Sequence, residues 1–241
     1  MSVAQTSNLR SVLAVENLEA WYGESHVLHG ISFSLQRGEV VALLGRNGSG
    51  RTTTLRAIMG LMDRRKGTIA IDGHDTMRLA PHQVARMGVG YCPEERGIFA
   101  SLSCEENLML PPQQSAGGMS IEEIYTLLPN LAERRRTPGT RLSGGEQQML
   151  AIARILRTGS HLLLLDEISE GLAPVIVDRL FDLVLLLRSR GYTILLVEQN
   201  KNFAGPLADR FLVVDHGKIA MRLSADELES QSDLVDRRLG V

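Results

Sequence analysis

The chain has 241 residues, of which 44% are hydrophobic and 22% are charged. This composition is that of an ordinary globular protein, and no apolar run approaches the roughly 18 residues of a membrane-spanning helix. With 26 basic and 28 acidic side chains the formal net charge is -2, which argues against a nucleic-acid partner. We expect one domain over residues 1–241, with Cys92 and Cys104 as small core residues.

Strand-like segments punctuated by glycine open the chain. They cover residues 13–23, 31–39 and 67–73. Short strands bounded by glycine turns are typical of hairpin-connected sheets. The pattern predicts an antiparallel β flank.

Three short runs are continuously apolar rather than alternating. They occupy residues 40–44, 162–165 and 193–197. Such runs suit strands that are covered on both faces, as in a parallel sheet. We expect them to form the centre of a mainly parallel core sheet.

Polar residues follow each of these runs. A glycine-rich segment follows the first, Asp166 and Glu167 follow the second, and Glu198 and Gln199 follow the third. Parallel strands place their carboxyl ends at one edge, where open α/β sheets bind ligands. The three sets of residues are therefore expected to converge on one site.

A long segment separates the glycine-rich segment from the second core run. Roughly 110 residues is too long for a crossover helix alone, so we expect an inserted lobe at about residues 91–158. Within it we expect a loop over residues 111–120 and a helix over residues 121–136. After the third core run we expect a helix at 202–208, a strand pair at 211–220 and a C-terminal helix from about 225.

The glycine loop GRNGSGRTT (residues 45–53) fits the phosphate-binding pattern G-x-x-x-x-G-K-[ST], except that Arg51 replaces lysine. It follows a predicted strand and precedes a predicted helix, the context that separates a phosphate site from a chance glycine-rich turn. Its N–H groups and the helix start can surround phosphate oxygens, and the Thr52 hydroxyl is placed to bind Mg²⁺. The expected nucleotide-binding residues here are Gly45, Arg46, Asn47, Gly48, Ser49, Gly50, Arg51, Thr52 and Thr53.

The second motif is the acidic pair Asp166 and Glu167. Taken alone, these carboxylates could be solvated turn residues at a strand end. Beside the glycine loop, Asp166 can hold a water-coordinated Mg²⁺, and Glu167 can orient or deprotonate the water that attacks a terminal phosphate. We therefore favour the pair as catalytic.

The third motif is LSGGE (residues 142–146), at the start of a predicted helix. Ser143 and Glu146 fit an S-x-x-E capping box, so a well-capped buried helix would explain them. It does not explain Gly144 and Gly145, which destabilise a helix but let a phosphate approach its end. We expect an anion site at this helix start.

These motifs, with SEGLAP after the acidic pair, closely resemble the ATP-binding subunits of ABC transporters over nearly the whole chain. The resemblance implies an α/β P-loop NTPase fold with an inserted α-helical subdomain. It also implies that two ATP-binding subunits face each other head to tail. Each ATP would lie between the glycine loop of one subunit and LSGGE of the other. Ser143, Gly144, Gly145 and Glu146 would then serve the partner's ATP.

Three further positions narrow the resemblance. Tyr22 matches the aromatic position that stacks on adenine. Trp21 and Tyr22 could equally pack into the sheet, but we expect Tyr22 to bind the nucleotide by stacking. Glu94 replaces the usual loop glutamine, and Gln199 replaces the usual switch histidine. With PEERGIF and SEGLAP, these residues resemble the LivF-type ATPase of branched-chain amino-acid importers; urea and amide importers look similar. Glu94 would join Thr52 and Asp166 as a Mg²⁺ ligand.

The expected catalytic residues are Glu167, Gln199 and Arg51. Gln199 can hydrogen-bond the γ-phosphate but cannot carry the charge of an imidazolium, so hydrolysis would depend mainly on Glu167. Arginine keeps the positive charge of the usual lysine, but its longer planar head does not fit a loop shaped around an ammonium. We expect ATP to bind and turnover to fall.

The resemblance therefore predicts an ATPase that energises import and lies at the cytoplasmic face of the inner membrane. It would be held there by two permease subunits and would act indirectly with a solute-binding protein. Two alternatives stay open: an ATP-gated dimerisation clamp with little hydrolysis because of Arg51, and a non-transport ABC ATPase. The transported solute, and whether the dimer pairs identical or different ATPases, are left open as well.

Overall fold

The computed structural model describes residues 11–113 and 117–240, so part of the predicted loop at 111–120 and the first ten residues lie outside the described chain. Its strands form one six-stranded and one four-stranded sheet. The strands are β1 (Ser11–Tyr22), β2 (Ser25–Gln36), β3 (Val40–Leu44), β4 (Arg64–Ile71), β5 (His74–Asp75), β6 (Val89–Cys92), β7 (Leu162–Asp166), β8 (Thr193–Glu198), β9 (Arg210–Asp215) and β10 (Lys218–Ser224).

The six-stranded sheet has the order β10-β9-β3-β8-β7-β6. The strands from β9 to β6 pair in parallel, and β10 pairs antiparallel with β9. The three continuous apolar runs are therefore neighbouring parallel strands, as predicted. Asp166 and Glu198 are the last residues of β7 and β8 rather than the first residues beyond them.

Both faces of this sheet are covered, which explains why its central strands are apolar throughout. In β3, Val40, Ala42 and Leu44 belong to one hydrophobic cluster, whereas Val41 and Leu43 belong to another on the opposite face. Successive side chains of a strand point to opposite faces, so a strand covered twice must be apolar at every position.

The four-stranded sheet has the order β2-β1-β4-β5, and all its pairings are antiparallel. The predicted antiparallel flank is thus confirmed. The second strand begins at Ser25, six residues before the predicted start (31 − 25). The two-residue turn after Tyr22 brings Ser25 directly opposite it, so pairing with β1 extends the strand through polar residues.

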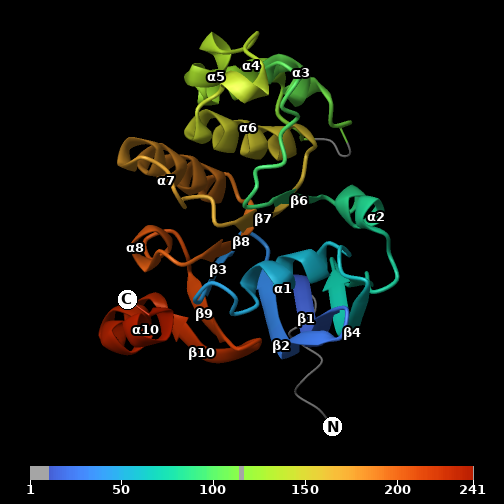
Figure 1. The fold of residues 1–241 in the computed structure, drawn as a ribbon, viewed down its shortest axis with the longest axis vertical. Helices are drawn as coiled ribbons and strands as arrows, with labels where there is room; N and C mark the ends of the chain where they lie inside the picture. The colour runs from blue at the N-terminus through green and yellow to red at the C-terminus, as the bar shows by residue number, and fades with distance from the viewer. Residues whose placement is uncertain (1–10, 114–116, 241) are drawn as a thin grey trace.

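Helices lie on both faces and at one end of the core sheet (Figure 1). In this view, α3 to α6 gather at the top, while α1 lies beside β1, β2 and β4 in the lower half. The helices are α1 (Arg51–Ile58), α2 (Pro81–Arg86), α3 (Cys104–Met109), α4 (Ile121–Leu127), α5 (Pro129–Glu133), α6 (Gly144–Arg157), α7 (Pro174–Ser189), α8 (Lys201–Ala204), α9 (Ala225–Ser230) and α10 (Ser232–Leu239), with a 3₁₀ turn at Gly139–Arg141.

The single helix predicted over residues 121–136 is wrong, because the segment forms α4 and α5. Leu128 adopts φ -127° and ψ 73° between them. The following residue is Pro129, and a residue before proline is driven away from the helical region. The C-terminal helix is likewise divided, at Gln231, and α8 is shorter than the predicted helix at 202–208.

The inserted helices follow a strand of the core sheet. β6, which contains Tyr91 and Cys92, pairs with β7, and α3 to α6 come after it. The bounds of the inserted subdomain at 91–158 stay a prediction. Cys92 and Cys104 are both buried and free, in agreement with their predicted place in the core. Among the described residues, no helix has the length and apolar character needed to cross a membrane.

Candidate functional site

The glycine loop connects β3 to α1, with Gly50 as the residue that precedes the helix. Gly48 and Gly50 adopt φ 80° and 109°, in the left-handed region that favours glycine. At Gly45, a Cβ atom would come within 2.5 Å of the Val214 carbonyl oxygen. All three glycines of the loop are thus required by the path of the backbone itself.

Two polar atoms of the glycine loop are buried and lack a hydrogen-bond partner within the described chain. They are Ser49 Oγ and Arg51 Nη1. Buried polar atoms nearly always have a hydrogen-bond partner, so unpaired donors at the N-terminus of a helix indicate a place for acceptor atoms. A hydroxyl and a guanidinium beside the start of α1 fit the oxygens of a phosphate group.

Arg51 makes a buried ion pair with Glu167. Arg51 Nη2 lies 2.8 Å from Glu167 Oε1, and the two side chains are only 2% and 7% exposed. The same nitrogen donates to Asn47 Oδ1 at 3.0 Å. Arg51 therefore contacts the expected catalytic carboxylate directly, although the two residues lie 116 positions apart in the sequence.

Thr52 and Asp166 meet across the same edge of the sheet. Thr52 Oγ1 donates to Asp166 Oδ1 at 3.1 Å, and the Tyr91 hydroxyl donates to Asp166 Oδ2 at 3.3 Å. Burial raises the pKa of Asp166 to about 6, and Glu94 adds to this effect while the two hydrogen bonds oppose it. Oxygen ligands of this kind suit Mg²⁺.

Glu94, the third expected Mg²⁺ ligand, has no hydrogen bond to Thr52 or Asp166 among the described contacts. Its side chain is exposed, in the segment after β6. Within residues 11–113 and 117–240, no cluster of three or more His, Cys, Asp or Glu side chains could hold a metal. The candidate magnesium ligands that already meet here are therefore the Thr52 hydroxyl and the Asp166 carboxylate.

The backbone of Glu167 is strained. Its φ is 47°, in the left-handed region that non-glycine residues seldom adopt. Burial raises the pKa of its carboxyl above the usual range. A hydrogen bond with Glu170 raises this pKa further, whereas the charge of Arg51 lowers it. Strained backbone and a raised carboxyl pKa are both typical of functional positions.

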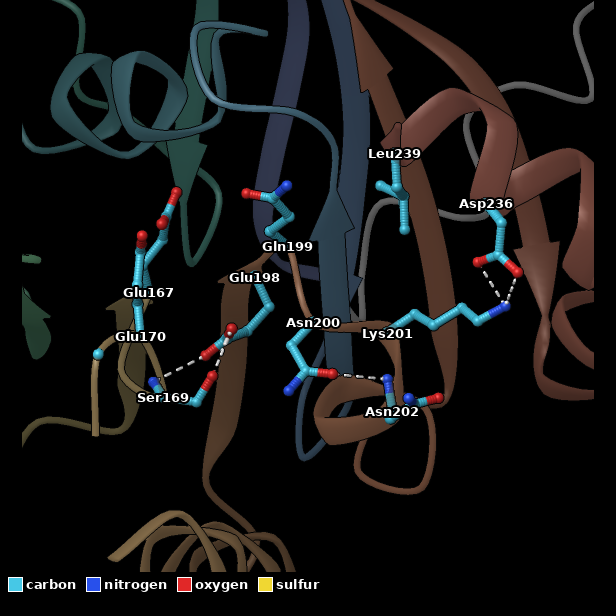
Figure 2. Close-up of a pocket in the computed structure, with 11 residues that line it drawn as sticks. Glu167, Ser169, Glu170, Glu198, Gln199, Asn200, Lys201, Asn202, Asp236 and Leu239 are labelled. Carbon is cyan, nitrogen blue, oxygen red and sulfur yellow. Dashed lines mark hydrogen bonds and ion pairs between the residues drawn. The ribbon is translucent and has the colours of Figure 1, made fainter. Parts of the chain in front are cut away.

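A pocket of about 620 Å³ lies beside Glu167, between the ends of β7 and β8 and the C-terminal helix α10. Figure 2 shows Glu167 and Glu170 on one side of it, and Asp236 and Leu239 of α10 on the other. The half-buried Gln199 lies between them. The predicted convergence of the β7 and β8 ends on one site is therefore present in the geometry.

The two aromatic residues at the end of β1, Trp21 and Tyr22, have different surroundings. Trp21 is buried, and its ring stacks on that of His26 at 4.2 Å. Tyr22 is 44% exposed, with the Arg56 guanidinium 6.0 Å from its ring centre. Arg56 belongs to α1, so Tyr22 offers an open ring face beside the helix that begins at the glycine loop.

With this geometry established, comparison with known proteins identifies the family. A family model described as ABC transporter matches residues 28–170, more than half of the chain. The chain is a member of the ABC transporter ATP-binding family. The family binds ATP and hydrolyses it, and the predicted P-loop NTPase fold is confirmed.

Individual relatives support the narrower resemblance. The chain is 36% identical to the high-affinity branched-chain amino acid transport ATP-binding protein BraG of Pseudomonas aeruginosa, over 95% of this chain and all of that protein. It is 35% identical to the probable branched-chain amino acid transport ATP-binding protein LivF of Archaeoglobus fulgidus, over 90% and 94%. The lipopolysaccharide export ATP-binding protein LptB of Haemophilus influenzae is 36% identical over 87% and 89%.

Solved structures agree with the fold. A dimeric ATP-binding cassette bound to ADP and phosphate superposes with a TM-score of 0.77 at 24% identity, covering 88% of this chain and 98% of the cassette. At this level of identity the likeness concerns the fold alone.

The LSGGE segment of this ABC ATPase lies apart from its glycine loop. Ser143 and Glu146 form the predicted capping box at the start of α6, and Figure 1 places α6 among the upper helices, away from α1. A Cβ at Gly145 would come within 2.5 Å of Ile176 Cγ2, so packing against α7 explains this glycine without a phosphate. At Gly144 the nearest atom would be Arg96 Nη2, at 3.2 Å.

Glu198 and Ser169 of this ABC ATPase had no expected role from the sequence. Glu198 was noted only as a polar residue at a strand end. It is buried, and it accepts hydrogen bonds from the Ser169 backbone N–H and hydroxyl. A carboxylate directly after four apolar residues in an interior strand was the available signal, because an acid there must find internal partners.

Glu198 also gives stability a pH dependence of definite sign. Burial raises the pKa of Glu198 from 4.5 to about 7, although its hydrogen bonds from Ser169 and the charge of Arg51 oppose the shift. The folded state thus binds this proton more tightly than the unfolded state. The resulting stabilisation is fully present below the unfolded pKa and is lost as the pH rises through the folded pKa.

Replacing Glu198 by the permanently neutral glutamine should therefore leave stability unchanged near pH 4.5 and raise it at higher pH. At about pH 8 the expected gain is about 3 kcal/mol. Urea unfolding of the two full-length chains at both pH values measures the difference. A gain that is the same at both pH values would contradict the assignment.

Proposed function

We propose that this chain is the ATP-hydrolysing subunit of an importer for branched-chain amino acids or a related small solute. BraG and LivF are both named as ATP-binding proteins of branched-chain amino acid transport, which supports this substrate class. The single observation that carries the ATPase assignment is the meeting of the glycine loop with Asp166 and Glu167, through the Thr52 and Arg51 contacts.

In this proposal the glycine loop, residues 45–53, surrounds the phosphates of ATP, with Ser49 Oγ and Arg51 as the unsatisfied donors. Tyr22 presents its exposed ring to adenine. Thr52 and Asp166, with Glu94 from the adjoining loop, would hold Mg²⁺, which supplies positive charge against the phosphate oxygens when bound.

Glu167 is the proposed general base. Its raised pKa lets it accept a proton from the attacking water near neutral pH, where carboxyls of ordinary pKa are weaker bases. Its ion pair with Arg51, in which Arg51 Nη2 binds Oε1, would open when ATP binds. Arg51 would exchange that carboxylate for phosphate oxygens, and Gln199 would hydrogen-bond the terminal phosphate.

The proposed assembly contains a second ATP-binding subunit and two permease subunits, which would hold the chain at the cytoplasmic face of the inner membrane. A solute-binding protein would act through the permeases. In such a dimer, Ser143, Gly144, Gly145 and Glu146 would contact the partner's ATP. At the start of α6 Ser143 is exposed and Gly144 is half-buried, which suits this role, whereas Gly145 is buried against Ile176.

A second candidate function is an ATP-gated dimerisation clamp with little hydrolysis. The observation that favours it is the same buried Arg51 to Glu167 ion pair, which would restrain the base if it persisted with ATP bound. If the partner ATPase carries a standard lysine, the transporter would then be asymmetric. The site at this chain's glycine loop would be slow, and the site completed by its LSGGE would be faster.

Reconstitution tests the proposed function. We expect proteoliposomes that contain this chain with its permeases to take up leucine-type amino acids in the presence of ATP and the solute-binding protein. ATP turnover should rise when that binding protein is loaded with solute. ATP binding without solute-dependent turnover would favour the clamp, and uptake that is unaffected by omission of this chain would contradict both.

A further inference from the structure

The loop after β7 is tied to the end of β8 by one buried pair of side chains. Glu198 is 2% exposed, and its Oε2 accepts from the Ser169 hydroxyl at 2.8 Å. Its Oε1 accepts from the Ser169 backbone N–H at 3.1 Å. Figure 2 shows both contacts at the foot of the pocket, below Glu167 and Gln199.

The two partners stand next to the proposed reacting groups. Ser169 lies two residues beyond Glu167, and Glu198 directly precedes Gln199. A second tie runs between the same segments, because the Glu167 backbone N–H donates to the Val197 carbonyl at 2.9 Å. The position of Glu167 relative to Gln199 thus depends on contacts between these two chain segments.

The strained backbone of Glu167 makes such a tie necessary. A non-glycine residue at φ 47° persists only where its surroundings hold it. Ile168 is fully buried and anchors one side chain of the loop, and the Ser169 contacts with Glu198 fix the next residue in both distance and direction. An apolar contact at this place would restrain the loop without setting its orientation.

The charges around Glu198 allow it to keep its hydrogen bonds with Ser169. Arg51 lies near enough to favour the ionised carboxyl, whereas burial and Glu170 disfavour it. Both the ionised and the neutral carboxyl can accept from the Ser169 donors through an oxygen. The tie therefore persists across the neutral pH range.

We propose that Glu198 is a positioning residue, which through Ser169 sets the Glu167 loop against the strand end that carries Gln199. Hydrolysis would lose rate without this tie, because a base displaced by about 1 Å reacts up to about 10²-fold more slowly. This inference rests on the proposed hydrolytic function, while the tie itself concerns the free chain.

Turnover by the reconstituted complex tests the role in hydrolysis. Glu198→Ala should lower kcat about 10-fold or more, with KM for ATP changed by no more than about twofold. Glu198→Gln, which keeps an acceptor oxygen for Ser169, should stay within about threefold of the wild-type kcat. Ser169→Ala should also lower kcat, and the Glu198→Ala/Ser169→Ala double variant should be no slower than Glu198→Ala alone.

Glu39→Ala is a matched control. Glu39 is a carboxylate that accepts hydrogen bonds from Arg210 and from the Gln36 backbone N–H, at the opposite end of β3 from the glycine loop. Its loss should lower thermal stability and leave kcat within about twofold of wild type. An equal loss of kcat in Glu39→Ala and Glu198→Ala would reduce the effect to general destabilisation and overturn the proposal.

Amide hydrogen exchange of the full chain separates this inference from the proposed function. Glu198→Ala should speed exchange in both residues 167–171 and residues 199–202, and Glu198→Gln should not. If the wild-type complex proves not to hydrolyse ATP, the proposed function fails while faster exchange in both segments still supports the tie. Unchanged exchange in Glu198→Ala would overturn the tie whatever the turnover.

Discussion

Replacing Glu167 by glutamine is expected to lower ATP turnover at this chain's own glycine loop by about 10²- to 10⁴-fold, the usual contribution of a general base. Glutamine keeps an oxygen that can accept from Arg51 Nη2, so the buried contact at 2.8 Å has a neutral replacement. ATP binding should therefore persist. Steady-state hydrolysis and equilibrium ATP binding by the complex, with the partner's site disabled, provide the measurement.

Glu39→Gln is the matched control for this substitution. Glu39 is also a carboxylate paired with an arginine, with Arg210 Nε at 2.5 Å, but it lies at the far end of the core sheet. Its turnover should stay within about twofold of wild type. If Glu167→Gln were equally active, another group would have to activate the water, and the assignment of Glu167 would be wrong.

Replacing Arg51 by lysine is expected to raise turnover at the same site by about 10- to 100-fold. The buried guanidinium donates through Nη2 to both Glu167 and Asn47, which holds it beside the proposed base. A lysine ammonium is compact and can point to the phosphates without holding the base. ATP turnover of the two complexes at saturating Mg-ATP measures the effect.

Equal turnover in the Arg51→Lys complex would mean that opening of the ion pair is not rate-limiting. Arginine would then be an adequate substitute for lysine in this loop, and the asymmetric and clamp hypotheses would lose their basis. A lower turnover would show that the loop is adapted to arginine. Measurement of ATP affinity alongside separates these outcomes from a change in binding.

The core of the fold could be predicted because local pattern and packing agree there. β3 is apolar at every position since both its faces are buried, and that pattern is visible in five residues. The helix at 121–136 was mispredicted because Pro129 interrupts an otherwise periodic segment. The element α7, with a proline at its first turn, was not predicted at all.

The candidate site, too, could be predicted only in part. The glycine loop and the acidic pair are contiguous motifs, and their place at the sheet edge followed from the expectation that parallel strands end at the same edge. The Arg51 to Glu167 ion pair joins residues 116 positions apart, and the Ser169 to Glu198 pair joins residues 29 positions apart. Such contacts depend on the direction of side chains from separate strand ends, which a single sequence does not encode locally.

Gly145 shows how one motif residue can have two explanations. The sequence suggested that it admits a phosphate, whereas its missing Cβ is already required by Ile176. Gly145 is itself buried at the start of α6. Only the packing explanation follows from this chain alone.

The exchange of Arg51 between Glu167 and ATP is most directly tested by an experimental structure of the assembled complex with Mg²⁺ and a non-hydrolysable ATP analogue. The account predicts Arg51 within hydrogen-bond distance of the phosphate oxygens and more than about 4 Å from Glu167. Nucleotide bound at the glycine loop while Arg51 still pairs with Glu167, as it does at 2.8 Å here, would contradict it.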